Sequence, residues 1–250
     1  MRIFKKIIEL EETGKTAVLA TVVETTGSTP REAGARMLIL DDGSTFGTVG
    51  GGAIEKAVVD EAGKLLKTGG NTLFRETLKD MGMYCGGGMT VYLETLNPPE
   101  RLVIFGGGHI GQILSKFAKS LGFHVTVIDN REEIANRQNL PDADDIICLD
   151  YAAALEQVTL LQSSYIVILT HKHTHDYEVL ESCIERPHRY LGMIGSKSKV
   201  ATCLCQLEEK GISKELITSI HSPIGLKIGG QTPAEIAISI AAELISVRHQ

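Results

Sequence analysis

The fold of this chain is decided by residues 101–131, which read RLVIFGGGHIGQILSKFAKSLGFHVTVIDNR. An apolar run leads into a glycine turn, a helical pattern follows, and a second apolar run closes the stretch. This succession predicts a strand, a tight turn, a helix and a parallel strand, which is the βαβ unit of a doubly wound sheet. Gly106, Gly108 and Gly111 complete the pattern G-x-G-x-x-G, and Asp129 ends the second strand. In this context the pattern indicates a dinucleotide-binding turn.

Each residue of this turn has an expected role. Gly106 permits the turn, Gly108 lets the backbone approach a pyrophosphate, and Gly111 lets helix and strand pack closely. The amides at the start of the helix offer donors to an anion. We expect Asp129 to accept from a ribose hydroxyl, which favours NAD over NADP, although Arg131 weakens that preference.

His109, inside the turn, either meets a ligand phosphate or is merely exposed. One function compatible with the turn is an NAD-dependent oxidoreductase. The alternative is a Rossmann sheet that keeps the turn for packing and binds no dinucleotide, because a fold does not determine its ligand.

The remainder of the second half continues the alternation of strand and helix. The last helix opens with TPAE, in which Thr232 is the expected N-cap, Pro233 the first helical residue and Glu235 the partner that completes a capping box. Further strands are expected at DDIICLD (144–150), SSYIVILTH (163–171) and RPHRYLGMIGS (186–196). Together these elements predict a Rossmann-like doubly wound parallel sheet.

A histidine-rich stretch, THKHTHDYE at residues 170–178, follows the fourth expected strand. His171, His173, His175 and Asp176 nearly match the spacing of the zinc ligands in metallo-β-lactamase-like hydrolases, so a metal-dependent hydrolase is one interpretation. The interpretation we favour is a polar loop lining the dinucleotide crevice, in which His171 and Asp176 touch the ligand.

The first half has the pattern of a smaller α+β domain. TAVLATVVETT (16–26) is a β-branched run, and Asp-Gly joins two short runs into an expected hairpin. A helix is expected over residues 53–69, and two strands at 72–78 and 89–96. The segment NPPER (97–101) cannot continue a strand ladder. We therefore expect two domains, residues 1–97 and 98–250.

The composition excludes several classes of protein. The chain has 250 residues, 43% of them hydrophobic, and a net charge of −6. The acidic net charge argues against sequence-independent binding of DNA or RNA, which needs basic patches, and the chain has no polybasic membrane signal. No apolar run spans a bilayer, and no signal peptide is recognisable, so we expect a cytoplasmic protein. Disulfides are not expected among the five cysteines.

Seven blocks of this sequence, in order and over nearly the whole chain, together resemble the XdhC/CoxI family. The blocks are TTGSTPREAGARMLI, GTVGGGAIE, YCGGGMTVYLE, VIFGGGHIG, VTVIDNR, YLGMIGSKSK and HSPIGLKIGGQTPAEIAISIAAELI. Members of this family are accessory proteins of xanthine dehydrogenase and related molybdenum hydroxylases. The resemblance implies a chaperone that binds the molybdenum cofactor, protects it while a cysteine desulfurase partner replaces an oxo ligand with sulfur, and delivers it to the hydroxylase.

The resemblance also implies self-association, with a homodimer as the expected state. It contains one departure: the block GGG-x-x-E often carries a cysteine after the third glycine, and here that position is Ala53. If a thiol there holds or sulfurates molybdenum in relatives, this chain must rely on Cys85 or work differently.

The molybdenum cofactor is a flat, anionic metal–pterin, and the first half supplies residues suited to it. Gly50, Gly51 and Gly52 precede a helix and offer an anion seat. Arg31 and Arg36 flank a loop of small residues and suit forked recognition of phosphate. The predicted role of Glu55 is to read pterin amines; its alternative role is the charge of a first helical turn.

Cys85 lies directly before Gly86 and Gly87. Its thiolate could ligate molybdenum or carry sulfur, with the glycine amides stabilising the negative charge. The alternative is a buried cysteine beside a glycine-rich bend.

Overall fold

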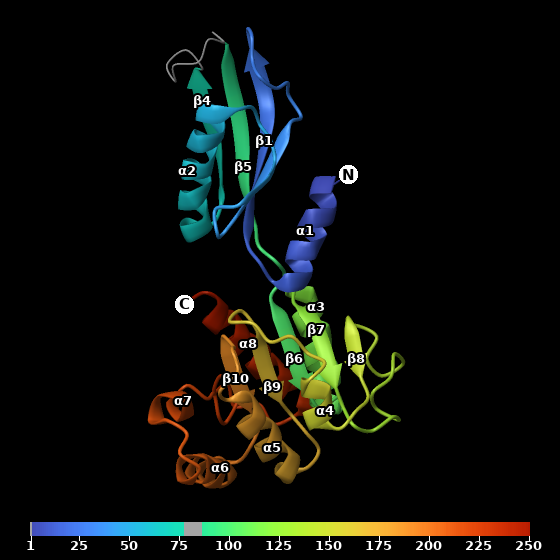
Figure 1. Ribbon diagram of the computed structural model, residues 1–250. Coiled ribbons are helices and arrows are strands. Elements are labelled where there is room, and N and C mark those ends of the chain that lie inside the picture. Colours follow the sequence, from blue (N-terminus) through green and yellow to red (C-terminus); the bar gives the residue numbers. More distant parts are fainter. Residues whose placement is uncertain (1, 78–86) are drawn as a thin grey trace. The chain divides into compact units, whose positions relative to one another are not determined.

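The computed structural model describes residues 2–77 and 87–250, without the side chains of Glu12, Thr77 and His173. The chain divides into two compact units, Met1–Pro98 and Pro99–Gln250 (Figure 1).

Unit 1 is a five-stranded antiparallel sheet with a helix on each face. The strand order is β3-β2-β1-β5-β4. The strands are β1 (Ala17–Thr26), β2 (Arg36–Leu40), β3 (Thr45–Gly47), β4 (Asn71–Thr77) and β5 (Gly88–Leu96), and the helices are α1 (Arg2–Thr13) and α2 (Gly52–Thr68). The hairpin of β2 and β3 is confirmed, with Gly43 at a φ of 79° in its turn.

Alternation along β1 determines which side chains each helix covers. Val18, Ala20 and Val22 face α2, in one core with Ile54 and Val58 of that helix. Residues of the opposite parity face the other side of the sheet, because successive strand residues point to opposite faces. These include Ala17 and Leu19, which pack with apolar residues of α1 such as Ile3, Ile7 and Leu10.

Unit 2 is a five-stranded parallel sheet with the order β10-β9-β6-β7-β8. Read from β8 to β10, this is the order 3-2-1-4-5 of a Rossmann sheet, so the predicted doubly wound fold is confirmed. The strands are β6 (Arg101–Phe105), β7 (His124–Ile128), β8 (Asp145–Ile147), β9 (Tyr165–Ile168) and β10 (Tyr190–Met193).

Helices cover both faces of this sheet (Figure 1). Side chains of α3 and α8 pack with Leu102 and Ile104 of β6, whereas side chains of α4, α5, α6 and α7 pack with Val103 and Phe105. The helices are α3 (His109–Ser120), α4 (Tyr151–Leu155), α5 (His173–Cys183), α6 (Lys197–Glu209), α7 (Lys214–Thr218) and α8 (Pro233–Arg248).

The start of α8 confirms the predicted capping box: the Thr232 hydroxyl accepts from the Glu235 amide, and the Glu235 carboxylate accepts from the Thr232 amide. Within the described ranges, no helix is long and apolar enough to cross a membrane.

Candidate functional site

Three sequence blocks that are far apart in the chain meet at one end of the unit 1 sheet. A Cβ atom built on Gly87 would lie 2.3 Å from the carbonyl oxygen of Thr26 and 2.5 Å from that of Ser28. A Cβ atom built on Gly50 would lie 3.0 Å from Cγ of Pro30. The loop after β1 therefore touches both glycine blocks. We call the region formed by residues 27–31, 48–55 and 87–88 the glycine end.

The glycine end contains the start of α2. Its N-cap is Gly51, which has no side chain to accept from the first amides of the helix. A Cβ atom built on Gly51 or Gly52 would have nothing within 4 Å, so the space beside this backbone is open. Gly52 has a φ of 47°, in the left-handed region that favours glycine. Exposed amides at the positive end of a helix dipole suit an anion.

Glu55 lies in the first turn of α2, as predicted. The Thr48 hydroxyl lies within hydrogen-bonding distance of the Glu55 carboxylate and of the Gly50 carbonyl, and it accepts from the Gly50 amide. Thr48 thus fixes the glycine block relative to the helix. Sequence reasoning missed this residue, although a threonine two positions before a glycine run is a signal of such a turn.

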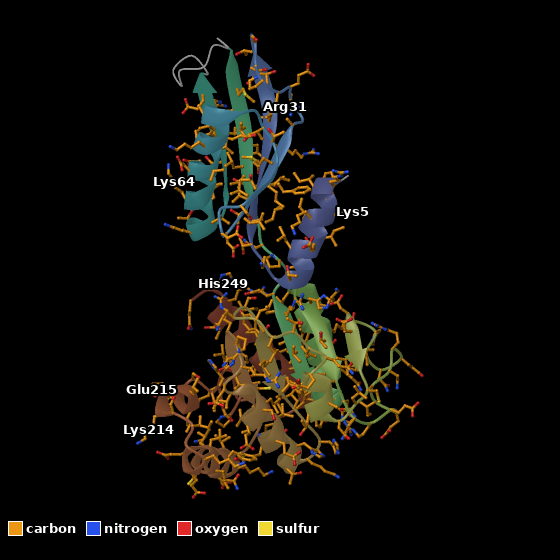
Figure 2. All side chains as sticks on the ribbon, viewed as in Figure 1. Lys5, Arg31, Lys64, Lys214, Glu215 and His249 are labelled. Atoms are coloured by element: carbon orange, nitrogen blue, oxygen red, sulfur yellow. The ribbon has the colours of Figure 1, made fainter. Side chains whose placement is uncertain are left out.

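The other predicted residues of unit 1 are distributed differently. Arg31, labelled in Figure 2, is exposed and follows Pro30 in the loop of the glycine end. Arg36 is not brought together with it, because its guanidinium lies 5.3 Å from the ring centroid of Phe4, on the face that α1 covers. Gly87 is buried against backbone, so packing alone requires a glycine there. Cys85 and Gly86 lie outside the described residues.

The predicted turn of unit 2 is formed by backbone packed on backbone. Gly106 has a φ of 117°, and a Cβ atom there would lie 2.2 Å from the carbonyl oxygen of Leu169. A Cβ atom on Gly111 would lie 2.1 Å from the Gly106 carbonyl oxygen, which explains the close packing of α3 on the turn. Gly108 is the N-cap of α3, and His109, the first residue of that helix, is exposed.

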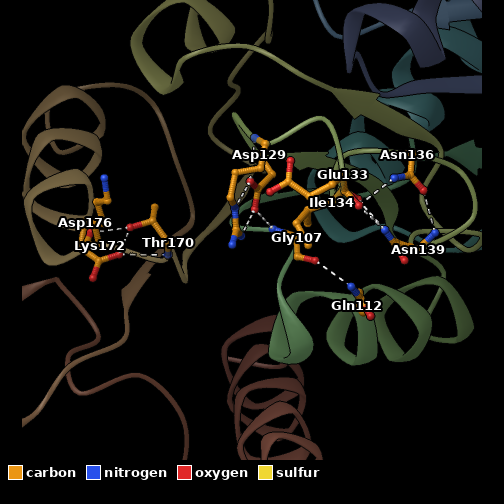
Figure 3. A network of polar contacts seen from close by, with 11 residues as sticks. Gly107, Gln112, Asp129, Glu133, Ile134, Asn136, Asn139, Thr170, Lys172 and Asp176 are labelled. Atoms are coloured by element: carbon orange, nitrogen blue, oxygen red, sulfur yellow. Dashed lines mark hydrogen bonds and ion pairs between the residues drawn. The ribbon is translucent and has the colours of Figure 1, made fainter.

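Asp129 has a role that the motif did not indicate. Its carboxylate is fully buried and accepts from the Gly107 amide at 2.8 Å (Figure 3). It also accepts from the Arg131 amide at 3.1 Å, from Arg131 Nε at 2.9 Å and from the second Arg131 side-chain nitrogen at 2.8 Å. A carboxylate offers about four lone-pair positions, and these bonds use them. In this arrangement Asp129 has no free lone pair to offer to a ribose hydroxyl.

These contacts also determine the charge of the pair. Burial acts to raise the pKa of Asp129, but hydrogen bonds from Arg131 and from the Gly107 amide outweigh it, so the pKa lies below its usual value. The carboxylate is therefore ionised at neutral pH. Binding of NAD(P) or another dinucleotide at this turn stays a prediction.

The histidine stretch has a different arrangement from a metal site. Asp176 is buried, and it accepts from the Thr170 amide at 3.0 Å and from the Thr170 hydroxyl at 2.6 Å, so it holds the loop between β9 and α5 (Figure 3). His175 Nδ1 lies 3.0 Å from Glu178 Oε2, and its ring centroid lies 5.5 Å from that of His171. Partial burial and the charge of Arg131 lower the pKa of His171.

Across the described side chains, no group of three or more His, Cys, Asp or Glu residues could hold a metal ion. The His173 side chain is not among them. The metal-dependent hydrolase therefore gains no support from this stretch, and contact of His171 or Asp176 with a ligand stays a prediction.

Comparison with known proteins identifies the family. Residues 102–244 match the model of the XdhC Rossmann domain, and residues 10–76 match the model of the XdhC and CoxI family. The chain belongs to the XdhC and CoxI family. The predicted resemblance is thus confirmed, with both units contributing to the match.

Several relatives and one solved structure are similar to this chain. The uncharacterized protein YqeB of Escherichia coli K12 is 36% identical over 100% of the chain and 47% of YqeB. The molybdenum cofactor insertion chaperone PaoD of the same organism is 28% identical over 99% of the chain and 89% of PaoD. A probable xanthine dehydrogenase subunit of Bacillus subtilis 168 is 29% identical over 63% of the chain and 46% of that protein.

The chain thus spans about half the length of two of these relatives. A crystal structure described as a xanthine dehydrogenase from Bacillus halodurans has a TM-score of 0.56 and 25% identity, over 98% of this chain and 95% of that one.

Proposed function

We propose that this protein binds the molybdenum cofactor at the glycine end of unit 1 and delivers it to a hydroxylase of the xanthine dehydrogenase type. Membership of the XdhC and CoxI family supports the proposal, as does similarity over 99% of the chain to a relative named as a molybdenum cofactor insertion chaperone. The single observation that carries the site is the meeting of three glycine-containing blocks at one end of the sheet.

The chemistry of the glycine end suits this cargo. The start of α2 offers amides without a side-chain cap beside open space, and Arg31 is exposed on the adjoining loop. Amide donors and a guanidinium recognise the phosphate and the anionic metal centre. Glu55 offers a carboxylate to the ring amines of a pterin. Arg36, whose guanidinium lies over Phe4, is the least suited of the predicted contacts.

Cys85 is the residue that we assign to the metal. Its thiolate would ligate molybdenum or receive sulfur from a cysteine desulfurase partner, since thiolate is a soft ligand and a nucleophile. Position 53 is alanine in this chain, so the proposed chemistry uses a single thiol in unit 1. We further propose that the protein acts as a cytoplasmic homodimer.

Reconstitution of an apo-hydroxylase tests the proposal. The apo-enzyme, released molybdenum cofactor, a cysteine desulfurase and cysteine are combined with and without this protein, and recovered hydroxylase activity is measured. We expect the wild-type chain to raise recovery and Cys85→Ala to lower it. Cys205→Ala is the matched control, because Cys205 is exposed on α6 and should leave recovery unchanged. Equal recovery with and without the chain would contradict the proposal.

A further inference from the structure

Exposed apolar side chains of unit 2 are concentrated at α8. The described side chains of this unit include five large apolar ones that are exposed, and four of them lie on α8 or in the loop before it. These four are Leu226, Ile228, Ile238 and Ile245. Single exposed apolar residues are ordinary, whereas a group of them on one surface marks an interaction site.

The outward side chains of α8 form one apolar stripe. Ile238, Ala242 and Ile245 are separated by four and three residues, which places them on the same side of a helix. Ile238 and Ile245 are exposed and Ala242 is half-buried. The opposite side of α8 packs in the core of unit 2, where Ile240 and Leu244 are fully buried. The helix is therefore apolar on both sides, and only one side is covered.

The loop before α8 widens this stripe. The Leu226 amide donates to the Ser239 carbonyl oxygen at 3.2 Å, and the Ser239 hydroxyl donates to the Leu226 carbonyl oxygen at 2.6 Å. These two bonds hold the loop against the helix beside Ile238. Leu226 and Ile228 thus add their exposed side chains to the same surface.

The charges of α8 lie at its two ends. Glu235 is in the first turn and Arg248 in the last. Glu243 is the one charged residue between them in the sequence, and its carboxylate accepts from the Tyr190 hydroxyl and, at 2.8 Å, from the Gly225 amide. Glu243 is thereby bound within unit 2. The outward side of the helix is apolar in the middle, with an acidic start and a basic end.

This pattern is complementary to a second copy of itself. In a dimer with two-fold symmetry both copies use the same surface, so a residue and its partner exchange places between the copies. Antiparallel pairing of two α8 helices around the midpoint of Ala241 and Ala242 places Ile238 of each copy opposite Ile245 of the other. Alanines at the crossing permit a close approach. The acidic first turn of each helix then lies near the basic last turn of its partner.

We propose that α8 pairs antiparallel with α8 of a second copy and forms the centre of the homodimer interface. The inference rests on the homodimer proposed above and adds the surface that forms it. A standard interface buries roughly 1,200–2,000 Å², which exceeds what one pair of short helices covers. Leu226 and Ile228, beside the stripe, therefore form part of the same interface.

Sedimentation velocity of the full chain tests this interface. One chain has a mass of 27.0 kDa, and we expect the wild type to sediment with twice that mass at micromolar concentration. Ile238→Lys with Ile245→Lys places like charges opposite each other twice, and it should weaken association at least about 100-fold. Ile238→Lys with Ile245→Glu places opposite charges at the same two contacts. It should associate at least about tenfold more tightly than the double lysine variant.

The control is Leu149→Lys. Leu149 and Ile245 are both 37% exposed, but Leu149 lies between β8 and α4, outside the stripe, so this variant should remain dimeric. All substituted side chains are exposed, and circular dichroism should show the native fold in every variant. Equal weakening of the two double variants would contradict the antiparallel pairing.

Two further outcomes separate this inference from the proposed function. A dimer that persists in the double lysine variant would overturn the location of the interface and leave the homodimer standing. A monomeric wild type would overturn both, including the case in which the stripe binds a hydroxylase instead of a second copy. The role in cofactor delivery is tested separately, by the reconstitution of the apo-hydroxylase.

Discussion

Replacement of Arg131 by methionine would isolate a buried carboxylate at the turn of unit 2. Asp129 is fully buried, and the Arg131 side chain, 29% exposed, supplies two of its hydrogen bonds. Removing one partner of a buried pair typically costs 3–5 kcal/mol. Two backbone amides still bind Asp129 in the variant, so we expect a loss of about 2–3 kcal/mol in the free energy of unfolding of unit 2.

This loss should be measurable by calorimetry of the full chain. For a unit of this size, about 2–3 kcal/mol corresponds to a decrease of about 5–10 °C in the melting temperature. The decrease should affect the transition of unit 2 and leave that of unit 1 in place. A double-mutant cycle with Asp129→Asn isolates the pair, because the double variant has neither the charge nor its partner. We expect the loss in free energy of unfolding of the double variant to be smaller than the sum of the two single losses by at least about 1 kcal/mol.

The pH dependence has a defined sign. The pKa of Asp129 is lowered in the folded wild type, so its contribution to stability is complete above the unfolded pKa of about 3.9 and is lost as the pH falls through the folded pKa. Without Arg131 the pKa of Asp129 in the folded variant is higher, and at neutral pH the variant already bears the cost of a buried carboxylate that has lost its ion-pair partner. The difference in the free energy of unfolding between wild type and variant should therefore shrink on acidification below about pH 5. Additive single losses together with a pH-independent difference would refute this account of the pair.

Three further predictions concern packing, capping and thiol reactivity. Gly87→Ala should destabilise unit 1 by about 1–3 kcal/mol in urea unfolding, because the new Cβ would lie 2.3 Å from a backbone oxygen. Gly63→Ala, inside α2, places its Cβ in open space and should stabilise unit 1 by about 0.5–1 kcal/mol. Equal effects of the two variants would contradict the packing described for Gly87. Thr232→Ala should cost about 1 kcal/mol through loss of the capping box, and an unchanged midpoint would argue against that cap. Burial raises the pKa of Cys183 to about 12, whereas Cys148 is exposed. Iodoacetamide should therefore modify Cys148 in the native protein and Cys183 only after unfolding. Mass spectrometry of the digested protein would show which cysteine is modified.

The sequence predicted the elements of unit 2 well because their signals are local. The apolar run, the glycine turn and the helix lie within residues 101–131, and each restricts the next. The capping box of α8 is equally local, since Thr232 and Glu235 are three residues apart. These patterns are predictable because residues close together in the sequence determine the local backbone geometry.

The candidate sites were less predictable because they depend on distant partners. Gly87 touches the loop after β1 only because Thr26 pairs with Gly88, 62 residues later. The motif assigned Asp129 to a ribose, yet Arg131 folds back onto it, and nothing in the spacing indicates that side-chain conformation. The Tyr151 ring of α4 packs edge-on against the His175 ring of α5, and the sequence does not encode this contact locally.

Direct binding of the molybdenum cofactor to the full chain tests the central claim. Cofactor released from a molybdenum enzyme would be titrated under anaerobic conditions into the wild type, Arg31→Ala, Cys85→Ala and the control Cys205→Ala. The account predicts one cofactor per chain, weaker retention in the first two variants and wild-type retention in the control. Retention that is the same in all four proteins, or no binding to the wild type, would contradict a cofactor site at the glycine end.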